Sequence, residues 1–194
     1  VSYLDYKNNV VKYAYKDGSG WHIEVVDTCP FAKDTGIALD VNDCAHICYY
    51  EYSPWGSGSL KCAHQNATGW LIETVAPVGN VSGHGGDTAI AIDSTGHLYI
   101  GFLDGDPNFD LKLAIKQGSS WSVETVDNVS QVCRQVSLAF DTNTYPHLSY
   151  FDGTWYSGVG NNDLRYAYKD GAGWHSEIVD SSGDTGWYLS LIHI

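Results

Sequence analysis

The sequence has few basic residues and no long hydrophobic run, and it contains no methionine. Its 194 residues include 10 Lys and Arg against 23 Asp and Glu, which gives a net charge of −13. This balance excludes a nucleic-acid partner, because binding to phosphates needs a basic surface that displaces counterions. No apolar run reaches the roughly 18 residues of a membrane-spanning helix, so we expect no membrane span.

The five cysteines are odd in number and form no Cys-x-x-Cys pair, which argues against a full disulfide framework and a standard zinc finger. No basic and apolar leader precedes the first strand-like segment, so no signal peptide is visible, and we expect the N-terminus to be truncated. Hydrophobic residues make up 43% of the chain and charged residues 17%. These fractions indicate a globular protein with a sizeable core rather than a disordered acidic tail.

Glycine and aromatic residues are abundant, and the tryptophans reveal an internal repeat. The 21 Gly, 14 Tyr and 7 Trp are typical of strands and tight turns. Trp-x-x-Glu segments recur at intervals of 49, 51 and 53 residues, beginning at Trp21, Trp70, Trp121 and Trp174. The repeat unit is therefore about fifty residues long.

Each unit contains strand-like segments of similar spacing. A strand before each Trp and a short turn predict a hairpin, in which positive dihedral angles are expected at Gly18, Gly69, Gly118 and Gly171. Upstream segments end at Asp40, Asp93 and Asp141, and another strand follows each of them. Four short strands per unit without helical periodicity predict an all-β fold, a β-propeller built from four-stranded antiparallel blades.

The repeat divides residues 1–194 into blades of a single propeller domain or segment. A partial blade covers residues 1–27, and three full blades cover residues 35–76, 87–127 and 136–180. Residues 189–194 are interpreted either as the first strand of the next blade or as a sequencing artefact, in which case further blades of the same chain are missing. Alternatively, residues 189–194 complete the first blade and close a four-bladed ring.

Loop lengths distinguish the two faces of the predicted disc. Two of the four connections in each unit have constant length, whereas the other two vary, and both of these emerge on one face. Variable loops on a repeated scaffold are where binding usually occurs, and exposed rings beside polar groups suit a sugar. The candidate ligand-binding residues on this variable face are Trp55, His84, Arg134, Trp155, Tyr156 and Trp187.

A loop on the same face has oxygen-bearing side chains at every second position, namely Asp104, Asp106, Asn108 and Asp110. Such alternation directs successive carboxylates into one cavity and predicts either a Ca²⁺ site or a solvated acidic turn. The loop departs from an EF-hand, because Phe109 occupies the glycine position and no bidentate Glu follows. No other cofactor is expected.

Two Cys and two His are predicted to approach one another in the second unit. Period-two alternation places Cys44, His46 and Cys48 on one face of a strand, and Cys62 and His64 on one face of the next strand. Antiparallel pairing of these strands predicts either packing with a contact between Cys48 and Cys62 or a zinc site.

Charged residues that recur in every unit are interpreted as structural. Acids that end strands, such as Asp40 and Glu51, are expected to accept backbone N–H bonds in turns. The Glu of each Trp-x-x-Glu segment is expected to protect an open outer edge. Arg165 occupies a strand position that the other units fill with Lys, and it is assigned to structure as well.

The segments DGSGWHIEVVD and KDGAGWHSEIVD, with strands such as PHLSYFD, resemble the repeats of secreted prokaryotic β-propellers, including a group loosely called sialidase-like. The resemblance covers essentially the whole chain and implies an extracellular or cell-surface protein. The turn is only Asp-box-like, because it is one residue shorter than a sialidase Asp-box and has Asn66 and Gln117 at the Asp position of two units.

The resemblance implies an architecture rather than an activity. A sialidase would need an arginine cluster for the substrate carboxylate, whereas this chain has only Arg134 and Arg165. We therefore favour a non-catalytic binding module that presents its variable loops to a carbohydrate or protein ligand, while the question of enzymatic activity stays open. The alternatives are a fragment of a sialidase-like glycoside hydrolase and a purely architectural repeat of a larger surface protein.

Overall fold

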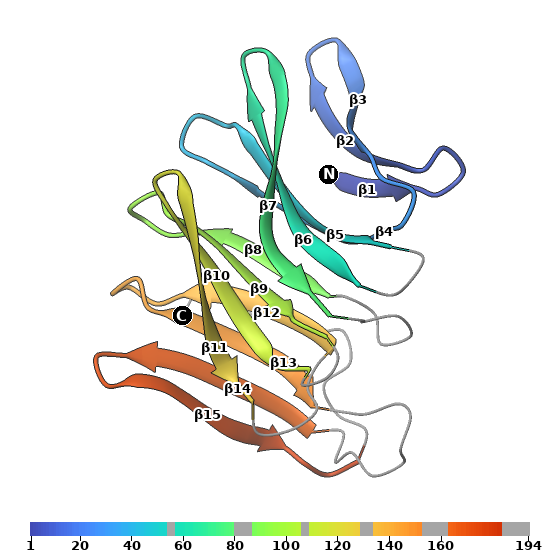
Figure 1. Cartoon of the computed structure of the whole chain (residues 1–194). Coiled ribbons are helices and arrows are strands. Elements are labelled where there is room, and N and C mark those ends of the chain that lie inside the picture. The colour runs from blue at the N-terminus through green and yellow to red at the C-terminus, as the bar shows by residue number, and fades with distance from the viewer. Residues whose placement is uncertain (54–56, 80–86, 106–108, 129–133, 153–162, 184–194) are drawn as a thin grey trace.

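The computed structural model describes residues 1–53, 57–79, 87–105, 109–128, 134–152 and 163–183, with the side chain of Arg134 left out. The described part is all-β, as the sequence predicts, and its strands form four antiparallel sheets (Figure 1). No helix in these ranges could cross a membrane.

The sheets follow one another along the chain. The first sheet has three strands, β1 (Ser2–Asp5), β2 (Val10–Asp17) and β3 (Gly20–Thr28). The second has four, β4 (Ala32–Leu39), β5 (Ala45–Tyr52), β6 (Gly58–Asn66) and β7 (Gly69–Val78). The third has β8 (Thr88–Ile92), β9 (Leu98–Leu103), β10 (Leu111–Gln117) and β11 (Ser120–Asp127). The fourth has β12 (Arg134–Phe140), β13 (Pro146–Asp152), β14 (Asp163–Asp170) and β15 (Gly173–Asp180).

Within each sheet the strands lie in sequence order, and among the described strands none is a counterpart of β4 in the first sheet, as the incomplete first repeat predicts. The first strands of neighbouring sheets, β4, β8 and β12, pack against one another in turn. Figure 1 shows the sheets in chain order, with the first and fourth at opposite ends of an open arc. The described strands therefore do not close a four-sheet ring.

The last two strands of every sheet form the hairpin that the repeat predicts. In two of the four hairpins, however, the positive φ angle is not at the glycine that the sequence predicts. Positive φ angles occur at Gly69 and Gly118, as expected, whereas the first and fourth hairpins have them at Gly20 and Gly173. The reason is that the residue with positive φ is the one directly before the Trp. In the third hairpin that residue is Ser120, and the positive φ angle occurs at Gly118 instead.

The middle strands carry most of the core, and in the second and third sheets a neighbouring sheet covers each of their faces. In β5, for example, Tyr49 and Tyr50 point to opposite faces, and both are fully buried. One apolar cluster lies between the first and second sheets, and a larger one continues through the others. The junctions between sheets are therefore the main sites of packing.

Candidate functional site

The sequence-predicted ligand residues fall almost entirely outside the described part of the chain. This holds for Trp55, His84, Trp155, Tyr156 and Trp187. Arg134 begins β12, so its backbone is placed at the start of the first strand of the fourth sheet. These six residues remain predictions.

The predicted Ca²⁺ loop is described only at its two ends, Asp104 and Asp110, while Asp106 and Asn108 lie outside. Asp104 forms an ion pair with Lys112 and accepts a hydrogen bond from the backbone N–H of Asp110 at 3.3 Å. Burial and the nearby charge of Asp104 raise the pKa of Asp110. A lysine on the first carboxylate would compete with a cation there, and the Ca²⁺ site stays a prediction.

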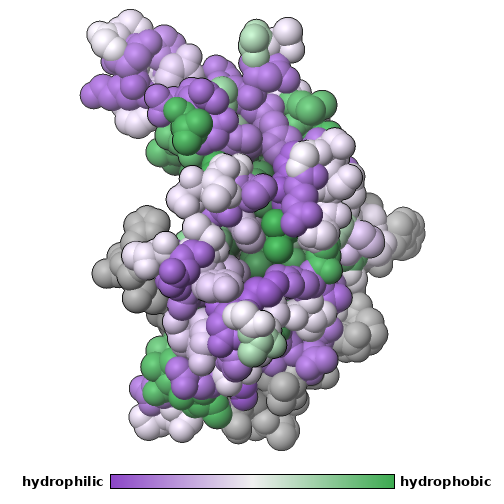
Figure 2. Space-filling view, turned by 90° about the vertical axis from the view of Figure 1, so that its left-hand side faces the viewer, coloured by the Kyte–Doolittle hydropathy of each residue, from purple (hydrophilic) through white to green (hydrophobic). Residues whose placement is uncertain are grey.

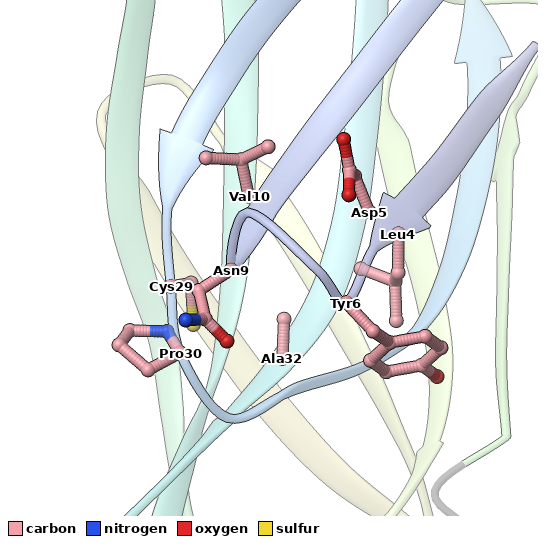
Figure 3. Close-up of a pocket in the computed structure, with 8 residues that line it drawn as sticks. All are labelled: Leu4, Asp5, Tyr6, Asn9, Val10, Cys29, Pro30 and Ala32. Atoms are coloured by element: carbon pink, nitrogen blue, oxygen red, sulfur yellow. The ribbon is translucent and has the colours of Figure 1, made fainter.

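A pocket on the same side of the sheets lies between the first sheet and the start of β4, and described residues line it (Figure 3). The β1–β2 loop contributes Tyr6 and Asn9, and the β3–β4 loop contributes Cys29 and Pro30. Figure 3 shows Tyr6 and Pro30 on opposite sides of the pocket, with Ala32 between them. The two loops are joined by a hydrogen bond from the Cys29 N–H to the carbonyl of Asn9 at 2.9 Å. The connections that form this pocket are the two that vary in length along the repeat.

The pocket combines an exposed ring with polar groups held in place. Tyr6 is 73% exposed, and Phe31, next to the pocket, is 49% exposed. Asp5 accepts hydrogen bonds from the side chain of Asn8 at 2.7 Å and from Lys12 at 2.6 Å. Bonding to Lys12, and then to Asn8, lowers the pKa of Asp5 to about 2, so its carboxylate is ionised at neutral pH. An aromatic face beside a fixed carboxylate and amides can bind a polyhydroxylated ligand.

The structural interpretation of Arg165 is confirmed, because the same ion pair recurs in each sheet. Its Nε lies 2.6 Å from the Asp152 carboxylate. The equivalent pairs in the other sheets are Lys12 with Asp5, Lys61 with Glu51, and Lys112 with Asp104. These acids end the second repeat strand, and their main partner is thus a cation on the next strand rather than only turn N–H groups.

The acids that end the first repeat strand do bind turn backbone, as expected. Asp40 accepts hydrogen bonds from the N–H groups of Asn42 and Cys44, at 2.8 and 3.0 Å. Asp93 and Asp141 make the same pair of bonds in their own turns. These acids do not form a carboxylate pair for catalysis, because each accepts backbone N–H bonds in a separate turn.

The prediction that the Trp-x-x-Glu glutamates protect an outer edge is wrong for three of them. Glu24 accepts a hydrogen bond from Trp70 Nε1 of the next sheet at 3.0 Å. Glu73 likewise binds Lys116 and Trp121 of the third sheet. Glu124 binds Lys169 of the fourth sheet, at 2.6 and 2.7 Å. The glutamates therefore join neighbouring sheets.

The cysteine and histidine pairs meet in the predicted register, with Cys48 opposite Cys62 and His46 opposite His64. Both thiols are free and buried. The Cys48 Sγ lies 3.3 Å from Thr88 Oγ1, and burial raises the pKa of this thiol to about 12. No group of three metal-ligating side chains occurs among the described residues, so packing is favoured over zinc there.

The two histidines and Glu73 form a polar chain within the second sheet, and Glu73 continues it to Lys116 of the third sheet. His64 Nε2 lies 3.1 Å from Glu73, and because a carboxylate only accepts, this nitrogen donates. In the neutral ring Nδ1 then accepts from His46 Nδ1, at 2.7 Å. Burial, with the charge of Lys116, lowers the pKa of His64.

The polar chain around His64 predicts that the protein loses stability on mild acidification. With a folded-state pKa below its usual value of about 6.5, His64 takes up a proton more readily in the unfolded chain. The free energy of unfolding should therefore fall as the pH drops below that value, and it should not change through His64 above it. Urea denaturation at pH 7.5 and 5.5 should show a smaller difference for His64→Gln than for the wild type. His97→Gln, on an exposed turn, controls for loss of a histidine, and an unchanged difference in His64→Gln would contradict the prediction.

Sequence reasoning missed a second link between sheets, which Asp34 and Asp87 make. Asp34 accepts from the N–H and hydroxyl of Thr88, at 2.5 and 2.8 Å, and Asp87 accepts from the N–H of Gln135 at 2.5 Å. The signal was the recurrence of Asp-Thr six residues before Asp40 and Asp93. It also missed Tyr6, which lies in the incomplete first repeat.

No family model and no curated protein matches the chain. Solved structures do match it. SapL1 lectin in complex with alpha methyl fucoside is 19% identical with a TM-score of 0.60, and the match covers 88% of this chain and 56% of that one. A protein of unknown function from Dyadobacter fermentans is 13% identical, with a TM-score of 0.61 and coverage of 92% and 60%.

A triple arginine-to-alanine mutant of AofleA from Arthrobotrys oligospora is 10% identical, with a TM-score of 0.63 and coverage of 93% and 53%. At these identities the likeness shows a shared fold. The chain spans 53–60% of the length of these three proteins.

Proposed function

We propose that this chain is a β-propeller segment of a carbohydrate-binding protein and that its binding is non-catalytic. The observation that carries the proposal is the fold shared with SapL1 lectin over 88% of this chain, since that lectin is in complex with a methyl fucoside. The repeated four-stranded sheets, arranged in order along an arc, support the propeller part of the proposal.

The pocket of the first repeat is the proposed sugar contact. Tyr6 offers an accessible ring to the C–H face of a pyranose, and the side-chain amide of Asn9 lies in the same pocket for the hydroxyls. The sequence-predicted residues Trp55, Trp155, Tyr156 and Trp187 belong to the same class of variable loop, and we propose them as further contacts. A methyl fucoside is the first ligand to test, with other methyl glycosides as comparison.

The Tyr6→Ala variant should bind methyl α-fucoside about three- to tenfold more weakly than the wild type, the range expected for loss of one aromatic contact. Isothermal titration calorimetry measures this change. Tyr145→Ala removes a ring that is also exposed, at 37%, from a turn between the first two repeat strands and is the matched control. Equal weakening in both variants, or none in Tyr6→Ala, would place the sugar elsewhere.

The described residues support a sialidase-like hydrolase less than they support a non-catalytic binding protein. Arg165, one of the two arginines, is already bound by Asp127 and Asp152, so its guanidinium is not available for a substrate carboxylate. We propose an extracellular or cell-surface location on the basis of the resemblance of the repeats to secreted propellers.

A further inference from the structure

The first residue of β14, Asp163, is a buried carboxylate without a partner in the part of the chain that the structure describes. It is 1% exposed, and both of its carboxylate oxygens are buried with no hydrogen bond to a described residue. Figure 2 shows a side of the molecule where hydrophilic residues lie at the surface, in contact with water. Asp163 has no such contact, and an unpaired charge in a buried site is strongly unfavourable. A positive partner for this carboxylate is therefore expected.

Two further carboxylates lie at the same end of the junction between the third and fourth sheets. Asp152 stands directly opposite Asp163 in the pairing of β13 with β14, so both side chains point to the same face. Asp152 is 5% exposed, and Asp127 of the third sheet is 3% exposed. Arg165 is shared by Asp152 and Asp127, with its Nε 2.6 Å from the first and its Nη1 3.6 Å from the second. One guanidinium among three carboxylates leaves an excess of two negative charges in the described part of this site.

The other sheets show that the recurring ion pair does not need an acid at the position of Asp163. This position lies two residues before the cation of the pair, and in the other sheets it is filled by Val10, Ser59 and Asp110. Asp110 is also an acid, but it is only partly buried, so water can solvate its charge. Among the four sheets a fully buried carboxylate at this position is therefore peculiar to the fourth, and the ion pair alone does not explain it.

We propose that Asp152 and Asp163 bind a divalent cation such as Ca²⁺ at this junction. Carboxylate oxygens are ligands that Ca²⁺ prefers, and carbonyl or water oxygens fill its remaining positions. Its two positive charges balance the excess that Arg165 leaves. No third His, Cys, Asp or Glu of the described residues completes a metal-binding group here, so the ion is held more weakly than in a cage of several carboxylates. The site is separate from the Ca²⁺ loop predicted from the sequence, whose described ends, Asp104 and Asp110, belong to the connection between β9 and β10.

Thermal unfolding with and without Ca²⁺ tests the proposal, after EDTA treatment and in about 0.1 M KCl, which screens weak attraction to the acidic surface. Ca²⁺ at about a hundred times its dissociation constant, measured by calorimetry, should raise the melting temperature of the wild type by about 5 °C or more. Asp163→Asn should abolish this shift, and without Ca²⁺ it should melt no lower than the wild type, because it removes an unpaired buried charge. Asp110→Asn makes the same change at the equivalent position of the third sheet and should keep the shift.

Three results would overturn the proposal. The first is a wild-type melting temperature that Ca²⁺ leaves unchanged. The second is a shift that Asp163→Asn retains, which would indicate an adventitious ion only. The third is a shift that Asp110→Asn abolishes, which would place the ion in the loop between Asp104 and Asp110. Circular dichroism checks the folding of the variants, and Asp163→Ser, which introduces the residue found in the second sheet, replaces Asp163→Asn if that variant does not fold.

Discussion

Replacing Arg165 with methionine is expected to lower the free energy of unfolding by about 3–5 kcal/mol, the cost of removing one partner from a buried ion pair. The guanidinium lies between two sheets, 2.6 Å from Asp152 and 3.6 Å from Asp127. The side chain of Asp127 is fully buried and that of Asp152 is 7% exposed. Without Arg165 both carboxylates would lose a cation in a site that water barely reaches. Urea denaturation followed by tryptophan fluorescence measures the change.

Lys112→Met is the matched control, because Lys112 has the same position in the preceding sheet. Its ion pair with Asp104 is more exposed, with side chains 25% and 18% accessible, and its loss should cost about 1 kcal/mol or less. Equal losses in the two variants would show that burial does not set the strength of this recurring pair.

Tyr50→Phe should destabilise the protein by about 2–4 kcal/mol through the loss of one oxygen atom, since it would leave two buried backbone groups without that partner. The hydroxyl of this fully buried residue donates to the Leu103 carbonyl at 3.0 Å and accepts from the Leu103 N–H at 2.9 Å. Leu103 lies one residue beyond Phe102, where the pairing of β8 with β9 ends. The tyrosine thus replaces a strand partner across the junction of the second and third sheets.

Tyr52→Phe provides the control within the same stack of rings. Tyr50 and Tyr52 lie 5.7 Å apart between ring centroids, but the buried Tyr52 hydroxyl has no hydrogen-bond partner among the residues that the structure describes. Its removal should leave the stability unchanged within about 0.5 kcal/mol or raise it slightly. Thermal unfolding of both variants separates the two cases, and a larger loss for Tyr52→Phe would contradict the hydrogen-bond argument.

The repeat made the strands and their grouping predictable. The spacing of Trp and Glu gives the hairpins, and the repeat predicts a partial blade for residues 1–27, where the structure describes three strands. Spacing does not show which neighbouring sheet covers a strand. The inward orientation of Glu24 and Glu73 was therefore missed, although their alternation along the strand was known.

A β-bulge in the first hairpin is another feature that the sequence could not show. In the first hairpin Lys12 pairs with Val25 and Val11 pairs with Asp27, so the ladder skips Val26. This bulge lets two consecutive residues reach the second sheet, with Val26 in the apolar cluster and Asp27 accepting from the Tyr49 hydroxyl at 2.5 Å. Strict period-two reading would place them on opposite faces.

The sequence predicts the face on which the candidate site lies, and the residues named on that face stay predictions. The variable face was chosen from loop lengths, and the described pocket around Tyr6 and Asn9 lies between two loops of that class. The residues named from the sequence are rings and polar side chains of later loops. Tyr6 was not among them, because nothing in its spacing distinguishes it from ordinary turn residues.

The most direct test of the account is a calorimetric titration of the wild-type chain with methyl α-fucoside, followed by NMR of the recovered sugar. The account predicts saturable binding that Tyr6→Ala weakens, with the glycoside recovered intact. No heat of binding with any methyl glycoside would contradict carbohydrate recognition by this chain. Binding followed by release of methanol would contradict its non-catalytic character.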